Sequence, residues 1–305
     1  MQSIRISAPA TSANLGSGFD ICGLALANPS DEMEVSISDA DAVRSAGRYA
    51  VPEELEGNSC GPVIKAMRKD FGIRECLEIT IDKRIRPGSG LGSSAASAAG
   101  AAYSIDRLFG LGLGAEQLVH YASLGEKVSA GVPHVDNVAP CILGGFTVVV
   151  GMNPLRIKRI QASDALEAII VLPEHGKAST KTAREVLPGT VSREDSQYNL
   201  RCLSSLICSM LDGDMEGVAA AMDDRIVEPA RERAGLLPHL HEIRDAGRRF
   251  GYGVAASGAG PAILLLGRKG SSEKESLLSE IDGLFKEEHK IIASGVSNRG
   301  IMPLD

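Results

Sequence analysis

A run of glycines and serines at residues 87–100 constrains the fold of this chain more than any other feature of its sequence. Apolar and polar residues alternate at 77–82, as in a half-buried strand, and an alanine-rich stretch predicts a helix from 93 to about 108. Ser93 or Ser94 can cap this helix, and Gly110 can end it. Because glycines let backbone N–H groups face an anion and a helix N-terminus is partly positive, this order favours a phosphate-binding loop.

Two common nucleotide motifs do not fit the glycine run. The Walker A pattern needs a lysine directly before its serine or threonine, whereas Leu91 and Gly92 precede Ser93. The glycine spacing does match the dinucleotide fingerprint, but that fingerprint expects an acidic strand end about 20 residues on, and Asp106 still lies inside the predicted helix. A tight turn with a purely structural role is the remaining alternative to phosphate binding.

The length and composition predict an ordinary globular protein with two domains. The chain has 305 residues, 44% hydrophobic and 23% charged, and a single core usually stops growing at about 250 to 300 residues. The pattern restarts after a predicted buried strand at 145–150, so we expect domains at 1–155 and 156–305. An opening strand should break at Pro9. Further strands are predicted at 34–38, 168–172, 253–257 and 262–266, and helices at about 61–70, 115–128, 199–211, 214–228, 238–249 and 272–288.

Charge and cysteine usage limit the expected partners and location. The net charge is −7 and the basic residues are scattered, which argues against nucleic-acid binding. There is no apolar run of membrane-spanning length and no apolar segment near the N-terminus, so we expect neither membrane insertion nor secretion. The six cysteines form no C-x-x-C pair and no zinc-like spacing with histidines, which predicts free thiols in a cytoplasmic protein.

Three stretches of the sequence resemble the motifs of the GHMP kinase superfamily, in the same order. The loop Pro87-Gly-Ser-Gly-Leu-Gly-Ser-Ser-Ala-Ala-Ser97 resembles its glycine-rich signature. Residues 8–20 are similar to its N-terminal substrate motif, and residues 257–265 to a glycine turn that closes over the nucleotide phosphates. The galactokinase and isoprenoid-kinase starts are absent, and Thr11-Ser-Ala-Asn-Leu-Gly16 points to the homoserine kinase family. This resemblance implies an α+β fold with an S5-like N-terminal domain and a ferredoxin-like C-terminal domain.

The resemblance also implies an activity: ATP- and Mg2+-dependent phosphorylation of L-homoserine, a step of threonine biosynthesis, with a homodimer as one expected state. Two alternatives stay open, which are a GHMP kinase for another hydroxylated acid or sugar and a non-catalytic nucleotide-binding regulator with the same fold. The implied ATP-binding residues are Asn58, as an adenine contact, and Pro87, Gly88, Ser89, Gly90, Leu91, Gly92, Ser93, Ser94, Ala95, Ala96 and Ser97.

Glu126 is the candidate metal ligand. Apolar residues at 115, 118, 119 and 122 form a helical stripe that reaches Glu126 four residues later, so its carboxylate should face inward. A buried acid is costly unless it is paired or bound to a metal, which predicts either a lysine partner or Mg2+. The resemblance selects Mg2+, held by Ser94 and Glu126 as catalytic residues. A frayed helix end that exposes Glu126 is the alternative.

The resemblance places the amino acid substrate among residues distant in sequence. It implies that Asn14 and Asp20 bind the polar head, and an amide and a carboxylate oxygen do suit an ammonium group. Arg184 and Arg231 lie in segments similar to those of the family and are assigned to the carboxylate, which a guanidinium can bind with two parallel hydrogen bonds. The remaining implied substrate contacts are His134, Asn137 and Thr180.

The catalytic base is less defined by the sequence. Residues 130–145 align with the region where mevalonate-type relatives place an aspartate that deprotonates the attacking hydroxyl. On an extended loop neighbouring residues point in opposite directions, so we expect that Asp136 and Asn137 do not face the substrate in the same manner, and the resemblance favours Asn137 as the catalytic residue. Because an amide cannot accept a proton at neutral pH, transfer would depend on alignment and charge neutralisation rather than on a strong base.

Overall fold

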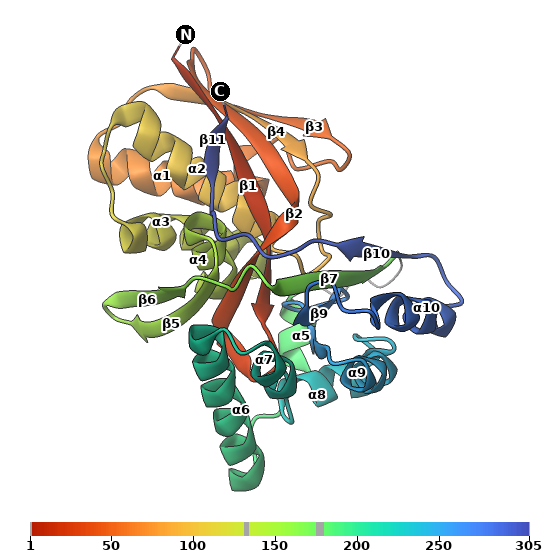
Figure 1. The fold of residues 1–305 in the computed structure, drawn as a ribbon. Helices are drawn as coiled ribbons and strands as arrows, with labels where there is room; N and C mark the ends of the chain where they lie inside the picture. Colours follow the sequence, from red (N-terminus) through yellow and green to blue (C-terminus); the bar gives the residue numbers. More distant parts are fainter. Residues whose placement is uncertain (1, 131–133, 175–179, 305) are drawn as a thin grey trace.

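The computed structural model describes residues 2–130, 134–174 and 180–304, which form two β-sheets covered by helices (Figure 1). The larger sheet has seven strands in the order β11-β1-β2-β4-β3, with β5 paired to β2 and β6 paired to β5. The smaller sheet has four strands in the order β10-β7-β9-β8. The predicted α+β fold with two domains is therefore confirmed.

The larger sheet and its helices are built from the first half of the chain and one C-terminal strand. Its strands are β1 (Ser3–Asn14), β2 (Gly18–Ser38), β3 (Ala42–Gly47), β4 (Cys76–Lys83), β5 (Phe146–Met152), β6 (Leu155–Ile160) and β11 (Met302–Leu304). Its helices are α1 (Cys60–Phe71), α2 (Ser93–Phe109), α3 (Ala115–Ala130) and α4 (Val135–Leu143), with a short 3-10 turn η1 (Leu55–Gly57) before α1.

The smaller sheet belongs to the second half. Its strands are β7 (Leu166–Pro173), β8 (Gly253–Ala256), β9 (Ile263–Arg268) and β10 (His289–Ala293). The helices of this half are α5 (Thr180–Glu185), α6 (Arg193–Asp212), α7 (Met215–Ala221), α8 (Val227–Arg233), α9 (Leu240–Arg249) and α10 (Lys274–Leu284).

Small residues let α2 lie close against the larger sheet. Its alanines are buried, and a Cβ on Gly100 would come 2.3 Å from the sulfur of Met33 on β2. At the other end Gly110 ends the helix in the left-handed conformation, at φ 62°, as the sequence predicts. The close approach holds α2 against the sheet, and the first residue of α2, Ser93, contacts the last residue of β4, Lys83.

Sheet membership does not follow the predicted boundary at residue 155. The strand β6 begins at Leu155 and pairs with β5 of the larger sheet. From the far end of the chain, β11 returns to pair with β1, so the blue C-terminal strand lies beside the red N-terminal one (Figure 1). The last strand of the larger sheet therefore comes after all four strands of the smaller sheet in the sequence.

Several predicted elements were wrong. The opening strand continues through Pro9 with a register shift in its pairing to β2, and the helix expected at 214–228 is two helices, α7 and α8. The helix expected at 272–288 ends at Leu284 and gives way to β10. Residues 135–143, expected to be extended, form α4, where Pro140 lies inside the helix. Pairing or packing with distant segments outweighs the local sequence preference in β1, β10 and α4. The start of α8 has a local cause, because Asp224 accepts the N–H groups of Val227 and Glu228.

Candidate active site

A pocket of about 350 Å3 lies between the glycine loop before α2 and elements of the second half of the chain. Most of the predicted site residues line it together. They are Asn14, Asp20, Asn58, Pro87, Gly88, Gly90, Gly92, Ser93, Ser94, Ser97, Glu126, His134, Asn137, Thr180, Arg184 and Arg231. Four residues of the glycine run do not line the pocket and are buried instead: Ser89, Leu91, Ala95 and Ala96.

The glycine loop has the backbone conformation that the sequence predicts for an anion site. Gly88, Gly90 and Gly92 have φ of 71°, 87° and 67°, a region that L-residues with a side chain rarely adopt. Gly92 is the N-cap of α2, so the predicted serine cap was wrong. The hydroxyl of Ser93 instead donates to the backbone oxygen of Ile85 at 3.0 Å. The N–H groups of the first turn are thus left without a serine cap.

Lys83, which the sequence analysis missed, fastens this loop to the sheet. Its ammonium donates to Asp31 Oδ2 at 2.6 Å, to the backbone oxygen of Ser93 at 2.6 Å and to Ser97 Oγ at 3.0 Å. Both members of the Lys83–Asp31 ion pair are buried. A signal was present in the sequence, because Lys83 continues the inward face of the alternating strand at 77–82 and so falls at a buried position.

Glu126 faces inward, as the stripe on α3 predicts. It is only 5% exposed, and burial raises the pKa of its carboxyl to about 7, while a hydrogen bond from Ser94 and the charge of Lys83 oppose that rise. Both Ser94 and Glu126 line the pocket beside the N-terminus of α2. A hydroxyl and a carboxylate are the hard oxygen ligands that Mg2+ accepts, so these residues fit the predicted metal.

Among the other residues that line the pocket, Arg184 connects two predicted substrate residues. Its Nη2 donates to Asp20 Oδ1 at 2.5 Å and contacts His134 Nε2 at 2.6 Å. Burial, and then the charge of Arg184, lower the pKa of His134, so the neutral ring can accept this bond. The buried Nε of Arg184 has no hydrogen-bond partner among the residues that the structure describes. That N–H is therefore a buried donor whose hydrogen bond is not made within the described residues.

A second arginine and an asparagine meet at the glycine turn after β8. Arg231 Nη1 donates to the backbone oxygen of Gly258 at 2.7 Å, and Asn14 Nδ2 donates to the same oxygen at 2.8 Å. Arg231 also donates from Nε to the backbone oxygen of Ala183 at 3.1 Å. Phe19, missed in the sequence analysis, lies near both guanidinium groups, with its ring centroid 5.2 Å from Arg184 Cζ and 5.5 Å from Arg231 Cζ.

The glycine turn itself contacts the glycine loop. Ser257 Oγ donates to the backbone oxygen of Gly90 at 2.8 Å, and the N–H of Ala262 donates to the backbone oxygen of Ser89 at 3.0 Å. A Cβ on Gly90 would lie 2.3 Å from the backbone oxygen of Ser257. The third motif of the sequence thus packs against the second, in line with its expected place over the phosphates.

Asp136 and Asn137 lie in the first turn of α4 rather than on an extended loop, and both line the pocket. Consecutive helical residues are about 100° apart, so both can border one cavity. Asn137 Oδ1 accepts the hydroxyl of Thr11 at 2.9 Å. Asp136 is buried; burial, and then the charges of Asp20 and Glu126, raise its pKa to about 7.

Asn58 borders the pocket, but its amide is used within the protein. Nδ2 donates to the backbone oxygen of Pro52 at 2.7 Å, and Oδ1 accepts the N–H of Cys60 at 3.0 Å. Asn58 therefore holds the segment at 50–52, whose residues Ala50, Val51 and Pro52 form a largely apolar wall of the pocket. Sequence reasoning missed this wall, because the segment has no periodic pattern.

Two other expectations concern the whole chain. All six cysteines are free thiols, as predicted. Within the described residues, no helix has the length and apolar character needed to cross a membrane.

The fold and the two glycine segments define a class of protein. The model of the GHMP kinases N terminal domain matches residues 58–145, and that of the GHMP kinases C terminal matches residues 205–282. The first match contains the glycine loop and both proposed metal ligands, and the second contains Arg231 and the glycine turn. The class is therefore that of the GHMP kinases.

Similarity over nearly the full length narrows the class. The chain is 40% identical over 291 residues to a homoserine kinase of Methanococcus maripaludis, covering 94% of this chain and 93% of that one. It is 43% identical over 270 residues to a homoserine kinase of Halorubrum lacusprofundi, covering 88% and 87%. The crystal structure of homoserine kinase from Cytophaga hutchinsonii superposes with a TM-score of 0.88 at 32% identity, covering 100% and 98%. The chain belongs to the homoserine kinase family of the GHMP kinases.

Proposed function

We propose that this protein transfers the γ-phosphoryl group of ATP to the hydroxyl of L-homoserine. Its membership of the homoserine kinase family supports this reaction. The residues that line the pocket support L-homoserine as the substrate. The pocket is lined by a glycine loop at a helix N-terminus together with two arginines and two carboxylates. This arrangement suits an anionic phosphate chain facing a small molecule that bears both charges.

The charged side of the pocket complements an α-amino acid. Arg184, whose buried Nε has no partner in the described part of the chain, and Arg231 would hold the carboxylate. Asp20 and Asp136 would accept from the ammonium, and Asp136 Oδ1 is a buried atom without a hydrogen bond among the described residues. Placing an ammonium there would satisfy a carboxylate that burial otherwise makes costly.

The glycine side would hold ATP and Mg2+. The backbone at 88–93 and the partial positive charge of α2 would bind the phosphates, and Ala50, Val51 and Pro52 would border the adenine. Ser94 and Glu126 would bind Mg2+, which when bound offsets negative charge on the phosphates. Lys83 would keep the first turn of α2 in place beneath them.

During transfer, the substrate oxygen forms a bond to the γ-phosphorus while the bond from phosphorus to the oxygen shared with the β-phosphate breaks. The amide of Asn137, fixed by Thr11, would orient the attacking hydroxyl, but it cannot take the proton. The proton would leave late or pass to the transferred phosphate. Alignment within the pocket would then supply most of the rate enhancement.

An ADP-release assay with purified protein tests the proposal. We expect turnover with L-homoserine and Mg2+, and a loss of about 10³-fold in kcat for Glu126→Ala. Glu116→Ala is the matched control, since this glutamate lies in the first turn of the same helix and is exposed. Comparable turnover on mevalonate or galactose would contradict the substrate assignment. ATP binding without any phosphotransfer would instead indicate a non-catalytic regulator.

Location and oligomeric state are part of the proposal as well. The six free thiols support a cytoplasmic protein. A homodimer is expected from the family resemblance, and light scattering of the purified chain would measure its mass in solution.

A further inference from the structure

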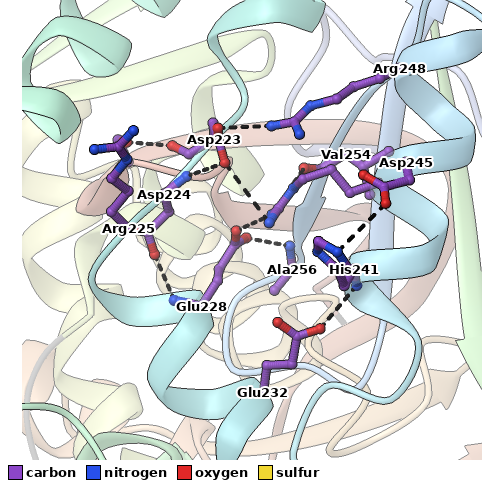
Figure 2. Close-up of polar contacts among 12 residues, drawn as sticks. Asp223, Asp224, Arg225, Glu228, Glu232, His241, Asp245, Arg248, Val254 and Ala256 are labelled. Atoms are coloured by element: carbon purple, nitrogen blue, oxygen red, sulfur yellow. Dashed lines mark hydrogen bonds and ion pairs between the residues drawn. The ribbon is translucent and has the colours of Figure 1, made fainter. Parts of the chain in front are cut away.

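The short helix α8 carries Arg231 and is joined to the smaller sheet by two contacts on one face. Glu228 Oε1 accepts the backbone N–H of Ala256 at 2.6 Å (Figure 2), and Arg231 Nη1 donates to the backbone oxygen of Gly258 at 2.7 Å. Residues three apart lie on the same helix face, so these contacts form two rungs between α8 and residues 256–258. The second rung ends at the glycine turn that borders the pocket.

Glu228 does not line the pocket, yet its carboxylate is buried and fully used. It is 3% exposed, and Oε2 accepts from Arg244 Nη2 on α9. Arg244 also donates from Nε to the backbone oxygen of Val254 on β8, at 3.4 Å. The carboxylate thus joins α8 to both α9 and β8. A buried acid is stable only with all such contacts made, so they restrict its position closely.

The beginning of α8 is fixed by a second acid. Asp224 Oδ2 accepts the N–H groups of Val227 and Glu228 at 2.8 and 2.6 Å, and Oδ1 accepts from Asn199 Nδ2 of α6 at 2.5 Å. Its neighbour Asp223 accepts from Arg248 at 2.9 Å (Figure 2). Asp224 holds only the N-terminus of α8. The rotation of α8 about its axis and its distance from β8 therefore depend on the contact between Glu228 and Ala256.

We propose that Glu228 is a positioning residue for substrate binding and that it acts through Arg231. By fixing α8 against Ala256, Glu228 sets where the guanidinium meets Gly258 and how far its remaining N–H groups reach into the pocket. The Gly258 oxygen also accepts from Asn14, so the same rung aligns the N-terminal substrate motif. This inference rests on the proposed function, in which Arg231 binds the substrate carboxylate.

Glu228→Gln tests the proposal with little change of shape. Ala256 donates to Oε1 and Arg244 donates to Oε2, so replacing either oxygen with an NH2 group removes one acceptor and places a donor against a donor. We expect KM for L-homoserine to rise about tenfold or more, with a smaller fall in kcat and a much smaller change in KM for ATP. Glu228→Asp, which keeps the charge but shortens the side chain, should give the same pattern and serves if the glutamine variant does not fold.

A double-mutant cycle separates positioning from a purely structural role. If Glu228 acts through Arg231, Glu228→Gln should cost little further homoserine affinity in an Arg231→Ala background, because residues that act as a unit are not additive. Glu232→Gln is the matched control, since this glutamate is on the same helix and accepts one backbone N–H, that of His241, at 3.0 Å. It should keep the wild-type constants.

Three results would overturn the inference. Glu228→Gln could have the same KM for L-homoserine as Glu232→Gln, or its KM for ATP could rise as much as its KM for L-homoserine. The losses of homoserine affinity from Glu228→Gln and Arg231→Ala could also be fully additive. The wild-type protein tests the proposed function separately. If it phosphorylated another hydroxylated acid instead of L-homoserine, the proposed function would fail, and the same cycle with that acid would still decide the role of Glu228.

Discussion

The two sides of the pocket are built in different ways. The phosphate side comes mainly from one continuous segment at 87–97, in which three glycines with positive φ lead into a helix. The substrate side is assembled from five separate places in the chain: residues 14–20, 134–137, 180–184, 231 and 258–260. Asn14 and Gly258, which share a hydrogen bond there, are 244 residues apart. One side is thus local in sequence and the other is a product of the tertiary fold.

Because the two sides are built differently, substitutions should impair them in different ways. A local loop depends on the backbone conformations of its own residues, so its weak points are its glycines. An assembled pocket depends on a few shared atoms, and the Gly258 oxygen, which accepts from Asn14 and Arg231, is one of them. A change at such an atom should disturb several substrate contacts together.

The largest effect should come from Lys83→Met, which tests how local the phosphate side is. Without the ammonium, the buried carboxylate of Asp31 loses its charged partner, and breaking a buried pair in this way costs about 3–5 kcal/mol. Urea unfolding would measure the loss. Adding Asp31→Asn should restore part of the stability, because the uncompensated charge is removed. An unchanged midpoint for Lys83→Met would mean that the loop does not depend on the ion pair.

Arg231→Ala should damage the assembled side selectively. The replacement removes the donors to Gly258 and Ala183 together with a proposed carboxylate contact, so kcat/KM for L-homoserine should fall about a hundredfold, or ~2.7 kcal/mol. Steady-state kinetics with each substrate varied would show a smaller change in KM for ATP. Arg233→Ala, two residues on and exposed, is the control. Equal losses for both substrates would remove the contrast between the two sides.

Gly90→Ala should damage the local side. The new methyl group would lie 2.3 Å from the backbone oxygen of Ser257, at a φ of 87° that alanine adopts poorly. We expect KM for ATP to rise about tenfold, which corresponds to ~1.4 kcal/mol. Gly110→Ala shares the left-handed backbone but has open space around it, so it isolates the backbone strain from the clash. Similar ATP constants for the two variants would argue against the close packing of loop and turn.

The smallest effect is a pH dependence on the substrate side. Burial and nearby carboxylates raise the pKa of Asp136 to about 7, so its charged form becomes more populated as the pH rises from 6 to 8. If that form accepts from the substrate ammonium, KM for L-homoserine should fall several-fold over this range. Asp136→Asn should bind more weakly and lose the dependence, as measured by kinetics at each pH. A pH profile in the variant identical to that of the wild type would contradict the assignment.

Residues whose role depends on near neighbours could be predicted well. The helix α2, its glycine start and its end at Gly110 follow from composition, and the burial of Glu126 follows from a stripe on one helix. Lys83 was predictable in principle from the same alternation that defines β4, but a lysine at a strand end is normally taken as exposed. The backbone at Asp136 and Asn137 was wrongly predicted to be extended. Pro140 argues against a helix in the sequence, but packing against the sheet stabilises α4.

By itself, the sequence determined the local parts of this protein: the glycine loop, the helix behind it and the inward carboxylate of Glu126. These depend on backbone preferences and periodicity over a few residues, which the sequence displays directly. Only the tertiary structure decided that Arg231 and Asn14 share the oxygen of Gly258 and that Glu228 holds α8 in place. Such contacts depend on the order of strands in two sheets and on desolvation, neither of which is expressed in local spacing.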